Sequence, residues 1–288
     1  MWIVFPHAPD DPTRVDPAFA DEEAAARLIG FHIAWYDHDG LVRDGQPSVV
    51  AVTGSPTTDQ RALLRGWMVP AEMYGQLREA ALASELALQL VVDRESYARA
   101  HYLPGWFGAA QALTARSMWI AGRNPDEAWT LYQSFTHADA LIKDWVKSAK
   151  AAWNEACFLP AGLSREQFGE IFERLLLERG TRFNRGVAIR EFLPFRRLPG
   201  FLGQIPRIEE HRIFFLHGRV LASSDGAPVD DVRWHRIVQE VGSPFMTIDV
   251  APLDNGEWRV IECGDGGVSG LAPDMDPRRF YAALWNRR

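Results

Sequence analysis

The chain has 288 residues, of which 47% are hydrophobic and 24% charged, and its formal net charge is −7. This length points to two domains, or to one domain with a large insertion. The mildly acidic balance argues against non-specific nucleic-acid binding, which needs a basic surface. The sequence contains no apolar run of about 18 residues for a membrane span, and its opening MWIVFPHAPDDPTR breaks at Pro6, too early for a secretory signal. We therefore expect a cytoplasmic protein.

Common metal, redox and hydrolase motifs are missing from the sequence. Cys157 and Cys263 lie far apart and form no CxxC unit, so neither a disulfide framework nor a zinc site is expected. The histidines show no HExxH spacing, and neither GxxxxGK[ST] nor GxSxG occurs. The sequence thus excludes P-loop and α/β-hydrolase interpretations at the level of motifs.

In the first third of the chain, strand-like and helix-like segments alternate, which favours a largely parallel, layered sheet. The expected strands are 2–5, 31–36, 48–53 and 88–92, and the expected helices are 21–29 and 74–88. Between Tyr97 and Arg123 the sequence becomes irregular and aromatic, with a Pro-Gly break. We place a domain boundary near Gly105.

All three lysines of the chain, Lys143, Lys147 and Lys150, lie within the segment LIKDWVKSAK, whereas the other 28 of its 31 basic residues are arginine. An ammonium group suits point contacts to phosphate oxygens, and arginine does not replace it geometrically. The alternative is a solvated charge run. The apolar positions of the segment fit a helix, but 141–146 also fits a strand, on which Lys143 and Lys147 would share one face.

The elements expected after the lysine segment have clear local signals. Ser164 and Gln167 form a capping box for a helix that ends at Gly180. The Gly- and Arg-rich loop that follows is either solvated or able to close over phosphates. The remaining expected elements are a helix over 126–135, a strand over 187–193, a hairpin turning at His217-Gly218, a helix capped by Asp230 or Asp231, and a helix opened by Pro277.

A second cluster of charge lies near the C-terminus, where Asn255-Gly256 predicts a tight two-residue hairpin turn. Counting outward from this turn pairs Asp249 directly with Glu262. Two carboxylates opposed across a ladder destabilise it unless a cation or a proton sits between them. Mg²⁺ is the natural cation, because it takes one or two carboxylates and leaves its other positions for water and phosphate.

The metal set and the register leave alternatives open. Asp265, in the Gly-rich turn after the second strand, could supply a third oxygen. Pro252 would fall on a ladder position that needs an N–H group, so a bulge or a wider loop is an alternative. A four-residue loop would make the two acids diagonal neighbours, and a three-residue loop would put them on opposite faces. A pair exposed to solvent at a sheet edge is the remaining interpretation.

The order of these motifs resembles the ATP-grasp superfamily. More narrowly, KDWVKS, IREF, EEHRIF, IDVA and IECGDGGVSGL resemble the clade named for one arginine and two lysines. The upstream stretch YARAHYLPGW is similar to the subgroup once described only as a domain of unknown function. The resemblance covers roughly residues 88–271. It implies an α+β chain with an ATP-grasp fold and an N-terminal α/β domain of the pre-ATP-grasp kind.

The resemblance implies roles for the basic residues. Lys143 and Lys147 would contact nucleotide phosphates, with Lys147 also acting in catalysis. Arg190 would correspond to the clade's arginine and face phosphate or the activated substrate, and Arg212 would reach the γ-phosphate region. These assignments make the nucleotide the shared ligand of distant segments.

The resemblance also implies a hinge and a metal set. Residues Glu191, Phe192 and Leu193 would meet adenine and ribose, largely through backbone groups. Asp249 and Glu262 would hold Mg²⁺. The superfamily usually has asparagine two residues after the last glutamate, and this chain has Gly264 there. Asp265 would substitute for it, which leaves the third ligand open.

The implied activity is ATP-dependent ligation with Mg²⁺. A carboxylate attacks the γ-phosphate to give an acyl phosphate, which an amine or a thiol then captures. A kinase or nucleotidyl transferase acting on a small molecule or a nucleic-acid end is one alternative, and a non-catalytic nucleotide-binding protein is another. The expected domains are 1–105 and 106–288, the latter with a nucleotide-lid part over 106–192 and a metal-binding part over 193–288.

Overall fold

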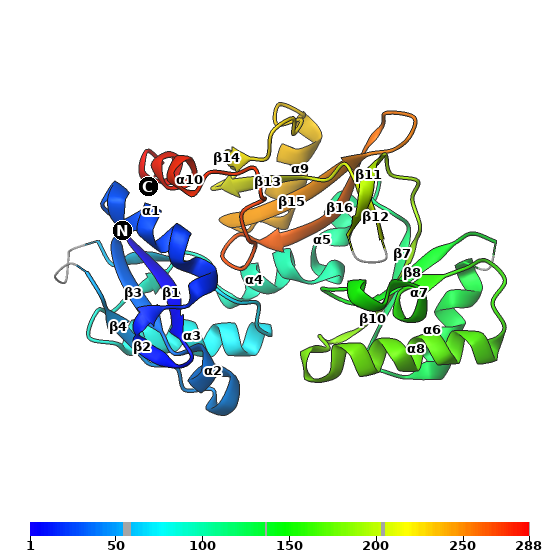
Figure 1. Ribbon diagram of the computed structural model, residues 1–288, viewed down its shortest axis with the longest axis horizontal. Coiled ribbons are helices and arrows are strands. Elements are labelled where there is room, and N and C mark those ends of the chain that lie inside the picture. The colour runs from blue at the N-terminus through cyan, green and yellow to red at the C-terminus, as the bar shows by residue number, and fades with distance from the viewer. Residues whose placement is uncertain (54–58, 136, 203–204, 288) are drawn as a thin grey trace. The chain divides into compact units, whose positions relative to one another are not determined.

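The structure is a computed structural model that describes residues 1–53, 59–135, 137–202 and 205–287 (Figure 1). The chain forms two compact units. Unit 1 comprises Met1–His101, His211–Ile248 and Cys263–Arg288, and unit 2 comprises Tyr102–Glu210 and Asp249–Glu262. The chain therefore passes between the units repeatedly. The domains expected as consecutive segments, divided near 105 and 192, stay a prediction.

Unit 1 begins with a sheet whose order is β4-β3-β1-β5-β6, with β2 paired to β1. Strands β3, β1, β5 and β6 are parallel, and β4 runs antiparallel to β3. Every side chain of the first five residues of β1 is buried, as expected for a central strand of a covered sheet. The strands are β1 (Trp2–Ala8), β2 (Asp11–Val15), β3 (His32–Tyr36), β4 (Val49–Ala51), β5 (Arg61–Leu64) and β6 (Gln89–Leu90).

Several helices of unit 1 start at an aspartate whose side chain accepts a hydrogen bond from a first-turn amide, which satisfies a donor that the helix leaves open. Asp37, Asp231 and Asp276 are such caps. Helices α1 and α10 pack against each other. The helices are α1 (Ala20–Ile29), α2 (His38–Asp44), α3 (Ala71–Ala83), α4 (Arg94–His101), α9 (Val232–Val241) and α10 (Pro277–Trp285), and a 3₁₀ turn, η1 (Pro17–Phe19), precedes α1.

A second sheet, of order β14-β13-β15-β16, carries the C-terminal hairpin. Its strands are β13 (His211–Leu216), β14 (Arg219–Ser223), β15 (Phe245–Pro252) and β16 (Trp258–Asp265). The expected turn at His217-Gly218 is confirmed, because both residues have positive φ, of 48° and 77°. All residues of β15 are buried. A charged side chain on this strand therefore needs a partner.

Unit 2 holds a sheet of order β7-β10-β8-β9 and a two-stranded sheet of β11 and β12. Aromatic residues of α6 and α8, with Phe135 between them, form its core with β8 and β10. The elements are α5 (Leu103–Ala110), β7 (Ser117–Ala121), α6 (Pro125–Tyr132), η2 (Gln133–Phe135), β8 (Ala140–Asp144), η3 (Lys150–Ala152), α7 (Trp153–Ala156), β9 (Phe158–Leu159), α8 (Arg165–Arg179), η4 (Gly180–Arg182), β10 (Gly186–Glu191), β11 (Arg197–Leu202) and β12 (Ile205–Ile208).

Local signals predicted several elements correctly. The capping box of Ser164 and Gln167 is confirmed at the start of α8, with both reciprocal hydrogen bonds present. The lysine segment is a strand over Ala140–Asp144 rather than a helix. Strands β5 and β7 were not predicted, because each is short and owes its extended form to its neighbours in the sheet.

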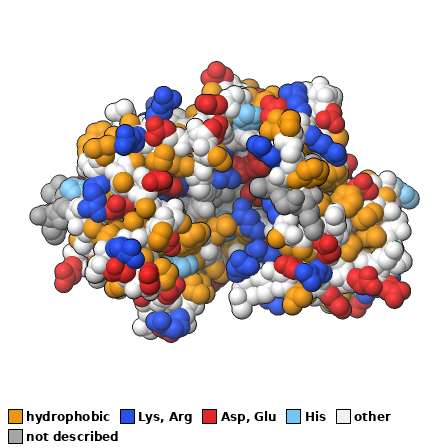
Figure 2. All heavy atoms as spheres, viewed as in Figure 1, with side chains coloured by type: hydrophobic (Ala, Val, Ile, Leu, Met, Phe, Trp, Pro, Cys, Tyr) orange, Lys and Arg blue, Asp and Glu red, His pale blue; other side chains and the backbone are white. Residues whose placement is uncertain are grey.

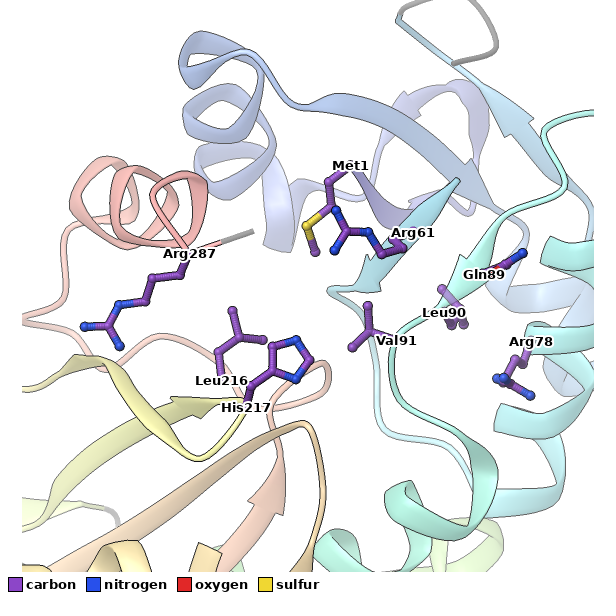
Figure 3. Close-up of a pocket in the computed structure, with 9 residues that line it drawn as sticks. All are labelled: Met1, Arg61, Arg78, Gln89, Leu90, Val91, Leu216, His217 and Arg287. Carbon is purple, nitrogen blue, oxygen red and sulfur yellow. The ribbon is translucent and has the colours of Figure 1, made fainter. Parts of the chain in front are cut away.

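A cavity of about 310 Å³ lies within unit 1, with Arg61, Val91, His217 and Arg287 among the residues that line it (Figure 3). Two of its cations already have partners. The Nε of Arg61 lies 2.9 Å from Oδ1 of Asp59, and the guanidinium of Arg287 donates to a backbone carbonyl. In the part of the chain that the structure describes, no helix is long and apolar enough to cross a membrane.

A buried ionic network ties the core of unit 1 together. Arg65 is 1% exposed, and its Nε and Nη2 each donate to the carboxylate of Glu22 at 2.8 Å. Tyr281 donates to the same carboxylate at 2.9 Å. Another nitrogen of Arg65 donates to the carbonyls of Gly266 and Ser269, in the turn that follows β16. This network joins α1, the residue that follows β5, α10 and the Gly-rich turn.

Removing one charge of this network should destabilise the fold strongly, because the other would stay buried without a full partner. We expect Glu22→Gln to lower the free energy of unfolding by about 3–5 kcal/mol and Tyr281→Phe by about 1 kcal/mol. Urea unfolding followed by circular dichroism measures both. Glu79→Gln, on an exposed part of α3, is the control and should change stability by less than about 0.5 kcal/mol. Equal effects of Glu22→Gln and Glu79→Gln would contradict the role of the network.

Candidate functional site

Two lysines meet one glutamate in unit 2. Lys143 lies on β8, and its Nζ is 3.6 Å from Oε2 of Glu262 and donates to the carbonyl of Val146 at 2.8 Å. Nζ of Lys147 is 3.0 Å from Oε1 of Glu262. The expectation that both lysines share a strand face is wrong, because β8 ends at Asp144 and Lys147 lies in the following turn. That turn returns the chain, so the two ammonium groups still converge.

Burial and neighbouring charges shift the pKa values of Lys143 and Glu262. Burial lowers the pKa of Lys143 to about 8, although Glu262 opposes the shift. Burial alone would raise the pKa of Glu262, but the attraction of Lys147 and Lys143 holds it well below its usual range. The carboxylate is therefore charged at neutral pH. Lys150 lies at the start of the following 3₁₀ turn and is exposed.

Arg190 supports the cluster from the same sheet. Ala188 pairs with Lys143, so Arg190, two residues further along β10, shares a face with Lys143. Arg190 is 7% exposed, and it donates to the carbonyl of Ile261 at 2.8 Å and to the hydroxyls of Thr114 and Ser117 at 2.8 and 3.1 Å. Its guanidinium thus fixes the backbone next to Glu262. A contact to phosphate or substrate stays a prediction.

The C-terminal hairpin has a wider turn than expected. The amide of Leu253 donates to the carbonyl of Glu257, and the amide of Gly256 donates to that of Leu253. The two-residue turn is therefore wrong: the loop has three residues, and Gly256, with φ of 87°, takes its last position. Pro252 stands at the end of β15, where a widened loop removes the need for its missing N–H group.

The register changes between the two ends of this hairpin. Far from the turn, the amide of Gly266 donates to the carbonyl of Phe245. Between this pair and the pair of Leu253 and Glu257 next to the loop, β16 contains one residue more than β15, as at a β-bulge. If this register continues from Phe245 and Gly266, Asp249 would lie opposite Glu262. Asp249 is 2% exposed, and its position across from Glu262 stays a prediction.

Gly264 stands where the superfamily usually has asparagine, and other side chains occupy the space beside it. A Cβ atom on Gly264 would lie 2.9 Å from Oγ of Ser269 and 3.0 Å from Oγ1 of Thr247. These two hydroxyls are 2.9 Å apart. The space of a side chain at 264 is therefore occupied by two hydroxyl groups, which is a physical reason for glycine there.

Asp265 has a different environment from Glu262. Alternation along β16 puts the two side chains on opposite faces of the strand. Asp265 is fully buried, and its Oδ1 accepts from the amide of Gly267 at 2.8 Å. Its Oδ2 has no hydrogen-bond partner among the described residues. Burial raises the pKa of Asp265 to about 7, against the Gly267 amide and the charge of Arg65. A role as third metal ligand stays a prediction, and this geometry favours a structural one.

The other predicted site residues are placed as follows. The amides of Glu191 and Phe192 donate to the carbonyls of Arg116 and Asp139, so neither is available to a ligand in this state. Leu193 follows directly and is half-buried. Their contact with adenine and ribose stays a prediction.

Arg212 is the second residue of β13 in unit 1, and its Nη1 donates to the carbonyl of Gly270 at 2.8 Å. Within the described part of the chain, no three His, Cys, Asp or Glu side chains gather as a metal-binding group. Basic and acidic side chains are interspersed over much of the face shown in Figure 2.

Sequence reasoning missed Asp144, which is fully buried between the two lysines of the motif. Its carboxylate binds the amides of Val146 and Lys147. An aspartate two or three residues before these amides is a signal for such a turn. This spacing is present in the sequence, but the sequence alone does not distinguish a buried aspartate in such a turn from an aspartate on the surface.

The N-terminal parallel sheet, the lysine-bearing sheet and the carboxylate-bearing hairpin define a protein of the ATP-grasp fold. A family model matches residues 132–284, more than half of the chain, and describes an ATP-grasp domain, family 3 of the clade named for one arginine and two lysines. The chain belongs to this family. It is an ATP-grasp protein, as the resemblance implied. No curated protein matches the sequence.

Solved structures with a similar fold are distant in sequence. The ATP-grasp ligase PsnB, complexed with a phosphomimetic variant of a minimal precursor, Mg and ADP, is 14% identical with a TM-score of 0.55, covering 99% of this chain and 98% of that one. The D-cycloserine synthetase DcsG is 14% identical with a TM-score of 0.57 and the same coverage. D-alanyl-alanine synthetase A from Vibrio cholerae is 12% identical with a TM-score of 0.61, covering 99% and 96%.

The raised pKa of Asp265 has a consequence for stability. The folded state binds the proton of this carboxyl more tightly than the unfolded state, so its contribution is full below about pH 3.8 and is lost as the pH rises to about 7. We expect Asp265→Asn to remove this loss, so that the variant gains stability relative to the wild type between pH 4 and 7. Urea unfolding at several pH values measures the difference. A constant difference across that range would contradict the assignment.

Proposed function

We propose that the protein is an ATP-dependent ligase that joins a carboxylate to an amine or a thiol through an acyl phosphate. The observation that supports it most directly is the contact of Lys143 and Lys147 with Glu262. Two cations on one carboxylate form a site whose charges suit a polyphosphate and a divalent ion. Membership in the ATP-grasp family supports a reaction of this class.

The residues present fit Mg²⁺ and a nucleotide by the chemistry of their donors. Asp249 and Glu262 offer carboxylate oxygens, the ligands that Mg²⁺ prefers in proteins. Mg²⁺ bound there would neutralise charge on the phosphate oxygens. The two ammonium groups would then turn from Glu262 to the phosphates. In the bound state, Lys143, Lys147 and Glu262 would thus exchange their ion pair for contacts with the phosphates and the metal.

The chain's own residues would act by position and charge. Negative charge spreads over the oxygens of the transferring phosphoryl group, and cations held in place stabilise it without reorganisation. Lys147 and Arg212 would serve the terminal phosphate, and Lys143 the phosphates behind it. Arg190 would hold the backbone at Ile261, or face phosphate or the activated substrate directly. Glu191, Phe192 and Leu193 would meet adenine and ribose.

The reaction course can be tested without knowing the acceptor. Hydroxylamine captures an acyl phosphate as a hydroxamate, so the protein would be incubated with Mg-ATP, hydroxylamine and a panel of amino acids and short peptides. The panel is motivated by structural relatives named for precursor peptides and for D-alanyl-alanine. We expect ADP, phosphate and a hydroxamate from at least one carboxylate. AMP with pyrophosphate, or a phosphorylated hydroxyl, would instead indicate nucleotidyl transfer or a kinase.

Pairing of the lysines with Glu262 predicts coupled binding of metal and nucleotide. A nucleotide without metal must compete with Glu262 for the lysines, and Mg²⁺ alone must compete with the lysines for Glu262. We expect Glu262→Gln to tighten metal-free binding of a non-hydrolysable ATP analogue by about tenfold, about 1.4 kcal/mol, and to abolish the strengthening by Mg²⁺. Calorimetry with EDTA or with Mg²⁺ measures both constants.

The control for this prediction is Glu257→Gln, on the same hairpin, where the carboxylate pairs with Arg259 at its exposed end. It should bind as the wild type does in both conditions. The same gain from Mg²⁺ in Glu262→Gln and in the wild type would exclude Glu262 as a metal ligand.

The lowered pKa of Lys143 predicts how nucleotide affinity depends on pH. The ammonium group is protonated below about pH 8 and loses its charge above it, whereas bound phosphate would stabilise the charged form. Affinity for the metal-free analogue should therefore fall as the pH rises from 7.5 to 9.5. Lys143→Arg, which keeps its charge in that range, should show a flatter profile. Parallel profiles for the two proteins would argue against a phosphate contact of Lys143.

A further inference from the structure

Asp144 is the most completely bonded carboxylate near the lysine turn. Its side chain is fully buried at the end of β8. Oδ1 accepts from the amides of Val146 and Lys147 at 2.7 and 2.6 Å. Oδ2 accepts from Nε of Arg179 at 2.7 Å and from the amide of Asn184 at 3.3 Å. One carboxylate therefore binds the lysine turn with one oxygen and the segment after α8 with the other.

This arrangement needs a carboxylate in particular. Burying a charge is costly unless hydrogen bonds and an opposite charge compensate it, and Asp144 has both. Each of its oxygens faces two donors. An asparagine would turn its NH₂ group toward one pair of them, so that donors would oppose donors. The pattern of contacts is thus specific to an acceptor at both positions.

The two lysines depend on Asp144 to different degrees. Lys143 is held by the pairing of β8 with β10 and by its own bond to the carbonyl of Val146. Lys147 lies beyond the strand, where its carbonyl accepts from the amide of Asp144 at 3.2 Å and its amide donates to the carboxylate of Asp144. Loss of the carboxylate should therefore displace Lys147 more than Lys143.

The second oxygen connects this turn to the Gly- and Arg-rich loop. Arg179 ends α8 and also donates to the carbonyl of Arg182 at 2.9 Å. The carbonyl of Asn184 accepts from the amide of Trp145, in the lysine turn. The loop is therefore bonded to the lysine turn on its inner side, while Arg182 is exposed.

We propose that Asp144 is the positioning residue for Lys147, and that it couples the Gly- and Arg-rich loop over 180–186 to the phosphate-binding lysines. This rests on the proposed function, because it takes the lysines to be ligands of a polyphosphate. Asp144 does not touch the nucleotide itself. It fixes the turn from which Lys147 reaches Glu262 in the free protein, and from which Lys147 reaches phosphate in the bound one.

A double-mutant cycle on nucleotide binding tests the coupling. Dissociation constants for a non-hydrolysable ATP analogue would be measured by calorimetry for Asp144→Asn, Lys147→Met and Lys143→Met, and for Asp144→Asn combined with each lysine variant. We expect Asp144→Asn to weaken binding about tenfold alone and with Lys143→Met, but less than twofold with Lys147→Met. An equal effect in all three backgrounds would show a general structural role and overturn the proposal.

The control is Asp126→Asn, an exposed aspartate of unit 2 whose carboxylate also pairs with an arginine, Arg165. It should leave nucleotide affinity unchanged. If Asp144→Asn does not fold, Arg179→Gln removes a single donor of the same carboxylate and should weaken binding in the same direction, again only while Lys147 is present.

A second measurement separates this proposal from the proposed function. Amide hydrogen exchange of the free protein should be faster at Val146 and Lys147 in Asp144→Asn than in the wild type, and unchanged along β10. Unchanged exchange at those two amides would overturn the positioning role. If exchange rises as expected while the wild type binds no nucleotide, the proposed function fails and the anchoring of the turn stands.

Discussion

The interaction on which this site depends is the convergence of two ammonium groups on the carboxylate of Glu262. Lys147 and Glu262 are 115 residues apart in sequence and 3.0 Å apart in space. Because Lys143 is buried and Lys147 and Glu262 are partly buried, their charges act on one another more strongly than fully exposed charges would. The sheet β7-β10-β8-β9 and the hairpin of β15 and β16 are the scaffolds that make this approach possible.

Buried charged side chains position Lys147 and Glu262 by binding the backbone that carries them. Arg190 binds the carbonyl next to Glu262, and Asp144 binds the turn that carries Lys147. Each of these two groups has hydrogen bonds directed to backbone atoms, so each stabilises a backbone shape and leaves the reactive side chains to face the ligand. Arg65 does the same in unit 1, where it binds two carbonyls of the turn after β16. Three buried charges thus fix the backbone of two turns and of one strand, β16.

Much of the fold could be predicted from local patterns. The capping box of α8 and the His217-Gly218 turn depend on residues within one turn of chain, so short-range chemistry decides them. The secondary structure of the lysine segment was ambiguous, because its apolar residues fit the repeat of a helix and that of a strand. Pairing with β10 stabilises the strand. The hairpin was predicted with the right strands and the wrong loop, because Asn255-Gly256 favours a two-residue turn, whereas the chain forms a three-residue loop with Gly256 at its last position.

By itself, the sequence determined the family, several of the helices and strands, and the residue types of the site, since motifs and caps act over a few neighbouring residues. Only the tertiary structure decided that Lys147 lies beyond its strand and that Thr247 and Ser269 occupy the space beside Gly264. It also decided that Asp144 is an anchor and Asp265 a buried acid on the opposite face of β16. The physical reason is that burial, register and hydrogen-bond partners are set by segments far away in the chain, which no local pattern specifies.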